Sequence, residues 1–277
     1  MTASALEEYL SLEVVSLFLV FMRIYGLVLF MPIFSSQTLP VTFRFYLVFA
    51  ISILLVPTVS PPVAFASSTM VSMGVTMMGE LAVGAVIGSL VHFVFSALQL
   101  AGQVAGTQLG LALAGISNPQ FDDQAATTSV VYATIASLAF FITGLDREVF
   151  RILLDTFQVI PLGQVAVEDS LLPFVLSVFG QSMILAVRIA APVTIALFLA
   201  ELAMAFVGRT VPQLNILSIG FSVRIMLGLM LTLAGLSEVG DIFCDYLVDA
   251  MAQVTDTLDQ WLSIPSSVEP AITNLVR

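Results

Sequence analysis

The sequence predicts an all-α membrane protein with about six apolar segments, and three observations support that prediction. Hydrophobic residues make up 59% of the 277 residues, and the mean hydropathy is +1.07. Charged residues make up only 10%, whereas a soluble domain has about 25%. Six apolar stretches approach the roughly 20 residues that a helix needs to cross a bilayer. We therefore expect a polytopic membrane protein with a single membrane domain over residues 1–277 and no soluble domain.

The charge and the few reactive side chains exclude several functional classes. All basic residues are Arg and the net charge is −11, which excludes a nucleic-acid-binding surface because such a surface needs clustered positive charge. One His and one Cys are too few for a zinc site, and a chain without Lys has no phosphate-binding loop. Cys244 has no intrachain partner for a disulfide, and the acidic start does not resemble a cleaved signal. We therefore expect no catalytic, cofactor or metal site and no enzymatic activity.

The first two apolar segments end at prolines. Segment one covers about residues 12–31 and contains Arg23. Pro32 and Pro40 then bracket what we expect to be a short loop. Segment two begins at Arg44 and reaches residue 55, just before another proline.

The third segment is too long for a simple membrane span. Residues 69–113 contain no Pro, so a continuous helix there would be roughly 65 Å long at 1.5 Å per residue. A hydrocarbon core is about 30 Å thick. We therefore expect this helix to bend at its glycines or to project beyond the membrane. Glu80 and His92 share one of its faces but are about 18 Å apart along the axis, too far to pair directly.

Glycines recur every four residues on the same segment. Spacing of four places residues on one helical face, and a face without side chains lets another backbone approach closely. Gln99, Gln103 and Thr107 form a polar row on the same helix. We expect helix packing at five positions: Gly84, Gly88, Gly102, Gly106 and Gly110.

A semi-polar loop follows this glycine face. The Asn118-Pro119 pair forces a turn, because the residue before Pro is pushed out of the helical region. Irregular backbone at membrane depth needs water or protein around it, not lipid. Two interpretations stay open: an ordinary connecting loop, or a loop that lines or closes a passage.

The second half of the chain alternates apolar segments with amphipathic ones. Segment four is residues 127–143, segment five is residues 172–207 with a kink expected at Pro192, and segment six is residues 216–236. Leu145, Val149, Ile152, Leu153 and Phe157 share one face of a helix whose other face carries Asp146, Arg147, Glu148, Arg151 and Asp155, a pattern typical of an interfacial helix. The tail predicts a second amphipathic helix, with Asp241, Asp245 and Asp249 facing water.

Charged side chains inside apolar segments are costly and normally face protein or water. One interpretation is an ion or solute pathway. The other, which we favour because buried charges are normally paired, is salt bridges or subunit contacts buried in an assembly. The polar residues expected to be buried are Arg23, Glu80, Gln99, Gln103, Arg188, Glu201 and Arg224.

Several motifs in order resemble the FliR family, a membrane component of the bacterial flagellar protein-export apparatus that is related to a component of virulence type III secretion. The N-terminal motifs are Arg23-x-x-Gly26 and Glu80-x-x-x-Gly84-x-x-x-Gly88. The stretch of residues 99–110 and Ile160-Pro161-Leu162-Gly163 follow. The most specific motif contains Pro212, Gln213 and Asn215.

The resemblance implies a non-enzymatic subunit that joins FliP and FliQ, and contacts FlhB and FlhA, in a helical export-gate assembly through which flagellar proteins pass. It places the chain in the bacterial inner membrane at the flagellar basal body, without nucleic acid. It implies long helical hairpins, with about residues 1–170 resembling FliP and about residues 171–262 resembling a FliQ hairpin. The last residues, 263–277, are rich in Pro and Ser, which predicts a loosely ordered tail. It also implies a plug loop over about Gly110–Gln124, including Gly110, Leu111, Leu113, Gly115, Ile116, Asn118, Pro119 and Phe121.

Two further functions stay open at this point. One is the homologous subunit of a virulence-type secretion system. The other is a secondary transporter of an ion or small solute, which would need paired broken helices in both halves of the chain.

Overall fold

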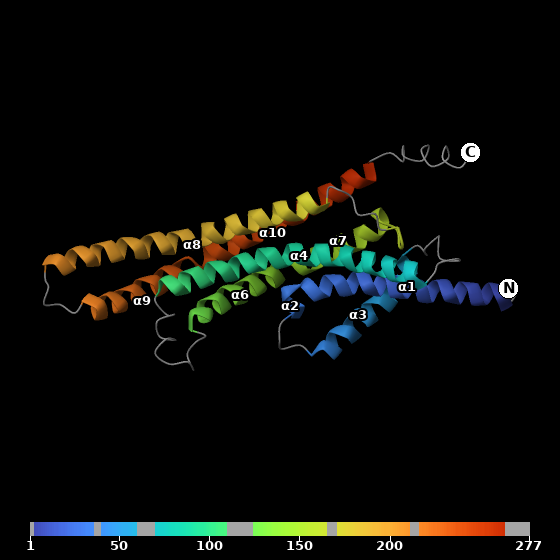
Figure 1. The fold of residues 1–277 in the computed structure, drawn as a ribbon, viewed down its shortest axis with the longest axis horizontal. Helices are drawn as coiled ribbons and strands as arrows, with labels where there is room; N and C mark the ends of the chain where they lie inside the picture. Colours follow the sequence, from blue (N-terminus) through green and yellow to red (C-terminus); the bar gives the residue numbers. More distant parts are fainter. Residues whose placement is uncertain are drawn as a thin grey trace. The chain divides into compact units, whose positions relative to one another are not determined.

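The computed structural model describes the chain except residues 1–2, 36–39, 60–69, 110–123, 165–170, 211–215 and 264–277. The described residues are helical and contain no strand (Figure 1), which confirms the predicted all-α fold. The helices are α1 (Ala3–Phe30), α2 (Pro32–Ser35), α3 (Val41–Leu55), the 3-10 turn η1 (Val56–Thr58), α4 (Met70–Gln108), α6 (Gln124–Ile142), α7 (Leu145–Val159), α8 (Leu171–Thr210), α9 (Ile216–Ala234) and α10 (Leu236–Ser263).

Within the described ranges, four helical stretches are long and apolar enough to cross a membrane: Glu13–Phe30, Val41–Thr58, Val71–Gln108 and Leu172–Thr210. The number of spans rises to six if each of two bent helix pairs, α6 with α7 and α9 with α10, forms one membrane span. Segments one, two, three and five of the sequence correspond to the four single spans, and segments four and six correspond to α6 and α9, the first helix of each bent pair. The chain is therefore a multi-pass membrane protein.

The long third and fifth segments are single helices. α4 has 39 residues, about 58 Å at 1.5 Å per residue, and α8 has 40 residues and continues through Pro192. One expectation was wrong in part, because the loop expected between Pro32 and Pro40 begins with the helical turn α2. Proline favours the first position of a helix, where its fixed φ fits and its missing N–H is not needed.

The chain divides into two compact units, which we describe separately. Unit 1 comprises residues 1–89, 146–169 and 248–277. In it α3 packs on α1, and Phe21 of α1 contacts the rings of Phe45 and Phe49 at 5.2 and 6.4 Å between centroids. The core of α1 itself is fully buried at Leu19, Ile24 and Leu27.

Unit 2 comprises residues 90–145 and 170–247. Phe95 of α4 lies at the centre of its aromatic contacts, 5.7 Å from the ring of Phe140 on α6 and 5.1 Å from that of Phe243 on α10. A second cluster joins α4 to α8 and α9 through Ala105, Leu109, Val193 and Leu197, with Leu227 and Leu231 against it. Aromatic edge-to-face pairs and aliphatic packing of this kind supply most of the energy of a helical core.

Both predicted amphipathic helices are confirmed. On α7 the buried residues include all five of the predicted apolar face: Leu145, Val149, Ile152, Leu153 and Phe157. On α10 the three aspartates 241, 245 and 249 are exposed, whereas Phe243, Leu247 and Ala250 are buried. The 3.6-residue period of the apolar pattern therefore set the orientation of both helices correctly.

Candidate functional site: a buried charged network and its surroundings

The backbones of α1 and α4 touch through glycines on both helices. A Cβ built on Gly84 would collide with the carbonyl oxygen of Arg23, and one on Gly26 would collide with the carbonyl oxygen of Leu81. At Gly88 the nearest atom would be the carbonyl oxygen of Leu27, at 2.5 Å. Side chains at these positions would push the helices apart, so the glycines set the distance between α1 and α4.

This close approach places a buried ion pair between the two helices. The Arg23 Nε and one terminal nitrogen both lie 2.6 Å from Oε2 of Glu80, and both side chains have an exposed fraction of 0%. Glu80 lies one helical turn before Gly84, the residue that contacts the Arg23 backbone. The same contact therefore fixes the main chain of Arg23 and brings its guanidinium to the carboxylate.

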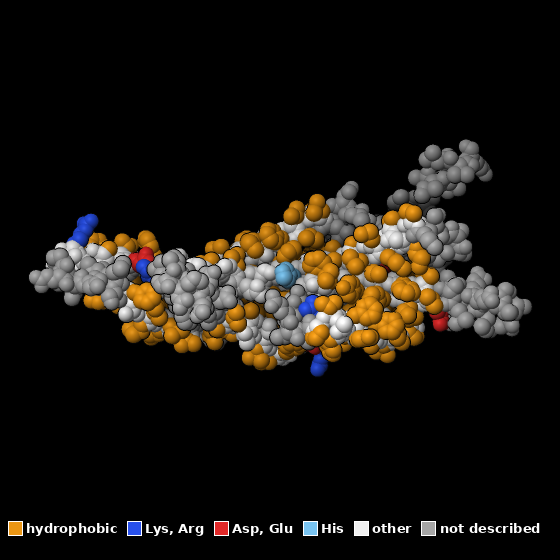
Figure 2. All heavy atoms as spheres, turned by 60° about the horizontal axis from the view of Figure 1, so that its bottom comes forward, with side chains coloured by type: hydrophobic (Ala, Val, Ile, Leu, Met, Phe, Trp, Pro, Cys, Tyr) orange, Lys and Arg blue, Asp and Glu red, His pale blue; other side chains and the backbone are white. Residues whose placement is uncertain are grey.

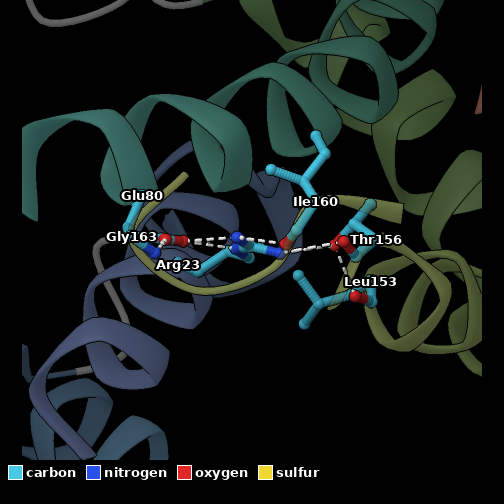
Figure 3. A network of polar contacts seen from close by, with 6 residues as sticks. All are labelled: Arg23, Glu80, Leu153, Thr156, Ile160 and Gly163. Carbon is cyan, nitrogen blue, oxygen red and sulfur yellow. Dashed lines mark hydrogen bonds and ion pairs between the residues drawn. The ribbon is translucent and has the colours of Figure 1, made fainter. Parts of the chain in front are cut away.

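The network continues into the end of α7 (Figure 3). Arg23 donates to the carbonyl oxygens of Thr156 and Ile160, each at 3.1 Å, and its guanidinium carbon lies 4.4 Å from the centre of the Phe157 ring. The second oxygen of Glu80 accepts from the backbone N–H of Gly163 at 2.9 Å. Gly163 has a φ of 83°, a conformation that favours glycine.

Each half of the ion pair thus has a distinct role at the end of α7. Carbonyl oxygens at the end of a helix attract a cation. The Thr156 carbonyl already accepts the N–H of Ile160 at 2.8 Å, and Arg23 adds one charged hydrogen bond to it and one to the Ile160 carbonyl. Glu80 neutralises Arg23 and holds the turn that follows α7. Three segments far apart in the sequence are joined by one buried network of hydrogen bonds and an ion pair. We call these four residues, Arg23, Glu80, Thr156 and Gly163, the α7 clamp.

The outer face of α7 carries charges although the clamp lies beside the middle of the candidate span Glu13–Phe30. Arg147 and Arg151 are exposed, and Arg151 lies 4.0 Å from Glu148. Exposed arginines are unfavourable in hydrocarbon. α7 therefore packs on α1 and α4 without offering a lipid-compatible outer face.

We expect Arg147→Cys and Arg151→Cys, each made with Cys244→Ser, to react with a membrane-impermeant thiol reagent in the isolated protein. The physical reason is that their charged face requires water. Mass spectrometry measures the extent of reaction at each cysteine, and a Cys in place of the fully buried Leu153 is the unreactive control. Protection of both arginine positions at the level of the control would show that α7 is inserted.

A second ion pair lies in unit 2, between Arg224 of α9 and Glu201 of α8. Its side chains are 30% and 43% exposed, so the pair is open to whatever surrounds the chain. Such a pair stabilises the fold by at most about 1 kcal/mol in water. The two pairs agree with the interpretation that charges in the apolar segments are matched by opposite charges.

The chain itself does not bury several polar residues that we expected to be buried. Gln99, Gln103, Arg188 and Glu201 are exposed, although Glu201 forms the ion pair with Arg224. Only Arg23 and Glu80 of the expected set are fully buried, and Arg224 is half-buried. Burial of the four exposed residues stays a prediction about an assembly.

The other expected packing glycines lie in unit 2. A Cβ on Gly102 would come within 2.8 Å of the Cα of Ser129 on α6, so α4 and α6 also approach through a glycine. Gly106 is buried, and Gly110 lies outside the described residues. A glycine that the expected set omitted, Gly228 of α9, has no room for a Cβ beside the side chain of Leu109.

Two predicted sites lie outside the residues that the structure describes. They are the plug loop, from Gly110 to Phe121 within about 110–124, and the family motif with Pro212, Gln213 and Asn215. Sequence reasoning missed Thr156 as a partner of Arg23, and it named Gly26 and Gly163 without connecting them to the ion pair. No periodic signal links residues 23, 80, 156 and 163, because the contacts are made only by tertiary packing.

Large apolar side chains cover much of the exposed surface (Figure 2). α3 shows this most clearly, since only 11% of its span is buried and Tyr46 and Leu54 are 69% and 73% exposed. α8 and α9 likewise expose Val187, Phe206 and Met230. Apolar exposure on this scale requires lipid or partner helices. Among the described residues no three His, Cys, Asp or Glu side chains are grouped to hold a metal.

Comparison with known proteins identifies the family. A family model described as bacterial export proteins, family 1, matches residues 14–250. The flagellar biosynthetic protein FliR of Caulobacter vibrioides is 24% identical over 227 residues, covering 82% of this chain and 90% of that protein. FliR of Bacillus subtilis is 26% identical over 228 residues, covering 80% and 86%. The Yop proteins translocation protein T of Yersinia pestis is 29% identical over 147 residues, covering 52% and 56%. The chain belongs to family 1 of the bacterial export proteins, the FliR family.

Proposed function

We propose that this protein is a non-enzymatic subunit of the flagellar type III export gate in the bacterial inner membrane, at the flagellar basal body. In this proposal it assembles with FliP and FliQ, contacts FlhB and FlhA, and forms part of the channel for exported flagellar proteins. Its first part, about residues 1–170, takes a FliP-like place and residues 171–262 a FliQ-like place. Family membership and the names of the FliR relatives support this proposal.

The observation that carries the proposal furthest is the position of α7. Its C-terminal end is bound by Arg23, midway along a candidate span of α1, while its exposed face carries Arg147 and Arg151. Lipid around unit 1 would have to accept exposed Arg147 and Arg151, which is unfavourable by several kcal/mol per charge. Partner subunits or water around this part of the chain remove that cost, and the apolar faces of α3, α8 and α9 then serve as subunit contacts.

The virulence-type alternative also has an observation in its favour. The Yersinia pestis relative, whose name describes translocation of Yop proteins, is 29% identical. It matches over 52% of this chain, whereas the FliR relatives match over about 80%. Coverage therefore favours the flagellar assignment.

In the same proposal, residues 110–124 form a plug that closes the channel, because apolar bulk in a narrow passage blocks ions and water.

We expect the tagged chain to co-purify with FliP and FliQ from the source bacterium, with the complex composition measured by native mass spectrometry. Shortening the loop between Ala114 and Phe121 should leave that complex intact and make the membrane permeable to small ions. Uptake of a small dye, or conductance in a bilayer, measures the leak. The physical reason is that removing apolar bulk from a constriction allows it to fill with water.

A matched deletion of the same length within the C-terminal residues 264–277 serves as the control, and it should neither leak nor lose partners. Purification of the chain as a stable monomer, with none of the expected partners, would contradict the export-gate assignment. Normal assembly with unchanged permeability after loop shortening would contradict only the plug.

A further inference from the structure

The second half of α4 carries a stripe of polar, uncharged side chains. Between Leu90 and Thr107 the polar residues are His92, Ser96, Gln99, Gln103 and Thr107. Their spacings of four, three, four and four place all five on one face of the helix. Four of them are exposed and Ser96 is half-buried. We call this set the α4 polar stripe.

The rest of the same helical stretch packs against the chain. Leu98, Ala101 and Ala105, on the opposite side, have exposed fractions of 0 to 1%. Successive residues of an α-helix are rotated by about 100° around its axis. On one side of the stripe lies Gly102, which contacts α6. On the other side lies Phe93, whose ring is 5.3 Å from that of Phe179 on α8. The stripe is therefore the part of α4 that faces outward between two packed neighbours in unit 2.

Lipid is a poor environment for this stripe. It lies inside the candidate span Val71–Gln108, whose mean hydropathy is 2.1. Moving an amide from water to hydrocarbon without a hydrogen bond costs roughly 4–8 kcal/mol, and Gln99 and Gln103 would each incur that cost. Elsewhere in unit 2 the exposed side chains of α8 are mostly apolar, for example Val187 at 68% and Phe206 at 66%. The contrast between these two surfaces indicates different surroundings.

We propose that the α4 polar stripe lines a water-filled passage and contacts an extended polypeptide moving through it. This inference rests on the proposed export function and adds to it the residues of the lining. One feature of the chain favours this occupant over a partner helix. The stripe has no fixed charge, although the chain has 19 acidic residues.

An uncharged lining suits the transport of polypeptides with different sequences. A fixed charge on the wall would hold segments of opposite charge and repel like charges by Coulomb interaction. Amides and hydroxyls can both donate and accept hydrogen bonds, so they replace water around a passing backbone without selecting its side chains. An apolar wall would instead exclude water from the passage.

Cysteine labelling in the assembled complex tests the proposal. Gln99, Gln103 and Thr107 are changed singly to Cys with Cys244→Ser, in membranes opened on both sides. A charged methanethiosulfonate reagent should modify all three at least about tenfold faster than Val187→Cys on the apolar face of α8, since it reacts only in water. An exported subunit fused to a domain that resists unfolding should then arrest in the passage and slow labelling at the stripe.

The outcomes separate the alternatives. Stripe cysteines that the charged reagent modifies no faster than Val187→Cys would not lie in water, and this result would overturn the proposal. Lipid and a partner subunit would both give it, because only the thiolate reacts and it forms in water. Fast labelling that the arrested subunit does not slow would exclude the polypeptide as occupant.

A separate experiment, in a different strain, tests the proposed export function itself. Export of the unfused subunit is measured in cells that lack this chain. Undiminished export there would refute the export function itself. Lost export together with a stripe that the charged reagent cannot reach would refute only the lining.

Discussion

Replacing Arg23 with Met should destabilise the folded chain by about 3–5 kcal/mol, because it leaves the Glu80 carboxylate buried without its counter-charge. Arg23 and Glu80 are both fully buried and 2.6 Å apart. The substitution also removes the cation that binds the Thr156 and Ile160 carbonyls at the end of α7. We expect the temperature at which half of the detergent-solubilised protein survives heating to fall by about 10 °C.

Limited trypsin digestion locates the change. All basic residues of the chain are Arg and there are 8 of them, so each cleavage is assigned by mass. Loss of the clamp should release α7 and accelerate cleavage after Arg147 and Arg151 more than after Arg224, which lies in the other unit. Equal acceleration at all three sites would indicate general unfolding and not release of α7.

Two double variants distinguish a clamp from a simple ion pair. Exchange of the charges, Arg23→Glu with Glu80→Arg, should not restore stability, because it directs a carboxylate at the carbonyl oxygens of α7. Arg23→Met with Glu80→Leu should be less harmful than Glu80→Leu alone, since no uncompensated buried charge remains. Recovery of wild-type stability by the charge exchange would contradict the role of Arg23 at the end of α7.

Sequence patterns were sufficient for the helices and for the direction of their faces. Local composition and the 3.6-residue period depend on neighbouring residues only, and they located the apolar segments, the long helix α4 and the buried face of α7. The glycine spacing likewise located close contacts at Gly84, Gly88 and Gly102. These features all follow from physical rules that act within one helix.

Tertiary partners were beyond the same reasoning. Arg23 is separated from Glu80 by 57 residues and from Thr156 by 133, and no periodicity within a helix extends across such a separation. The surroundings of Gln99, Gln103, Arg188 and Glu201, which are exposed in the single chain, also stay a prediction about an assembly. A polar residue in an apolar segment must avoid lipid, but the rule does not state whether its own chain, water or another subunit surrounds it.

We expect Gly84→Ala to destabilise the chain, although alanine normally favours helices. An added Cβ at this position meets the carbonyl oxygen and carbon of Arg23 and the amide nitrogen of Leu27, the last at 2.9 Å. All three are backbone atoms within the buried part of α1, so a rotamer change cannot relieve the contact. Overpacking of this type costs about 1–3 kcal/mol, and α1 must shift away from α4 to accommodate the methyl group.

Gly74→Ala is the matched control. Gly74 lies on the same helix, and a Cβ there would meet no atom within 4 Å, so the substitution should stabilise α4 by about 0.5–1 kcal/mol through helix propensity alone. The two variants should therefore change the stability of the chain in opposite directions, which is measured as the fraction of each variant that survives heating in the same detergent. The shift of α1 should also lengthen the Arg23–Glu80 contact, so Gly84→Ala should accelerate trypsin cleavage at Arg147 and Arg151 while Gly74→Ala leaves it unchanged. If Gly84→Ala is as stable as Gly74→Ala, the two backbones are not in contact, and the glycines do not position the clamp.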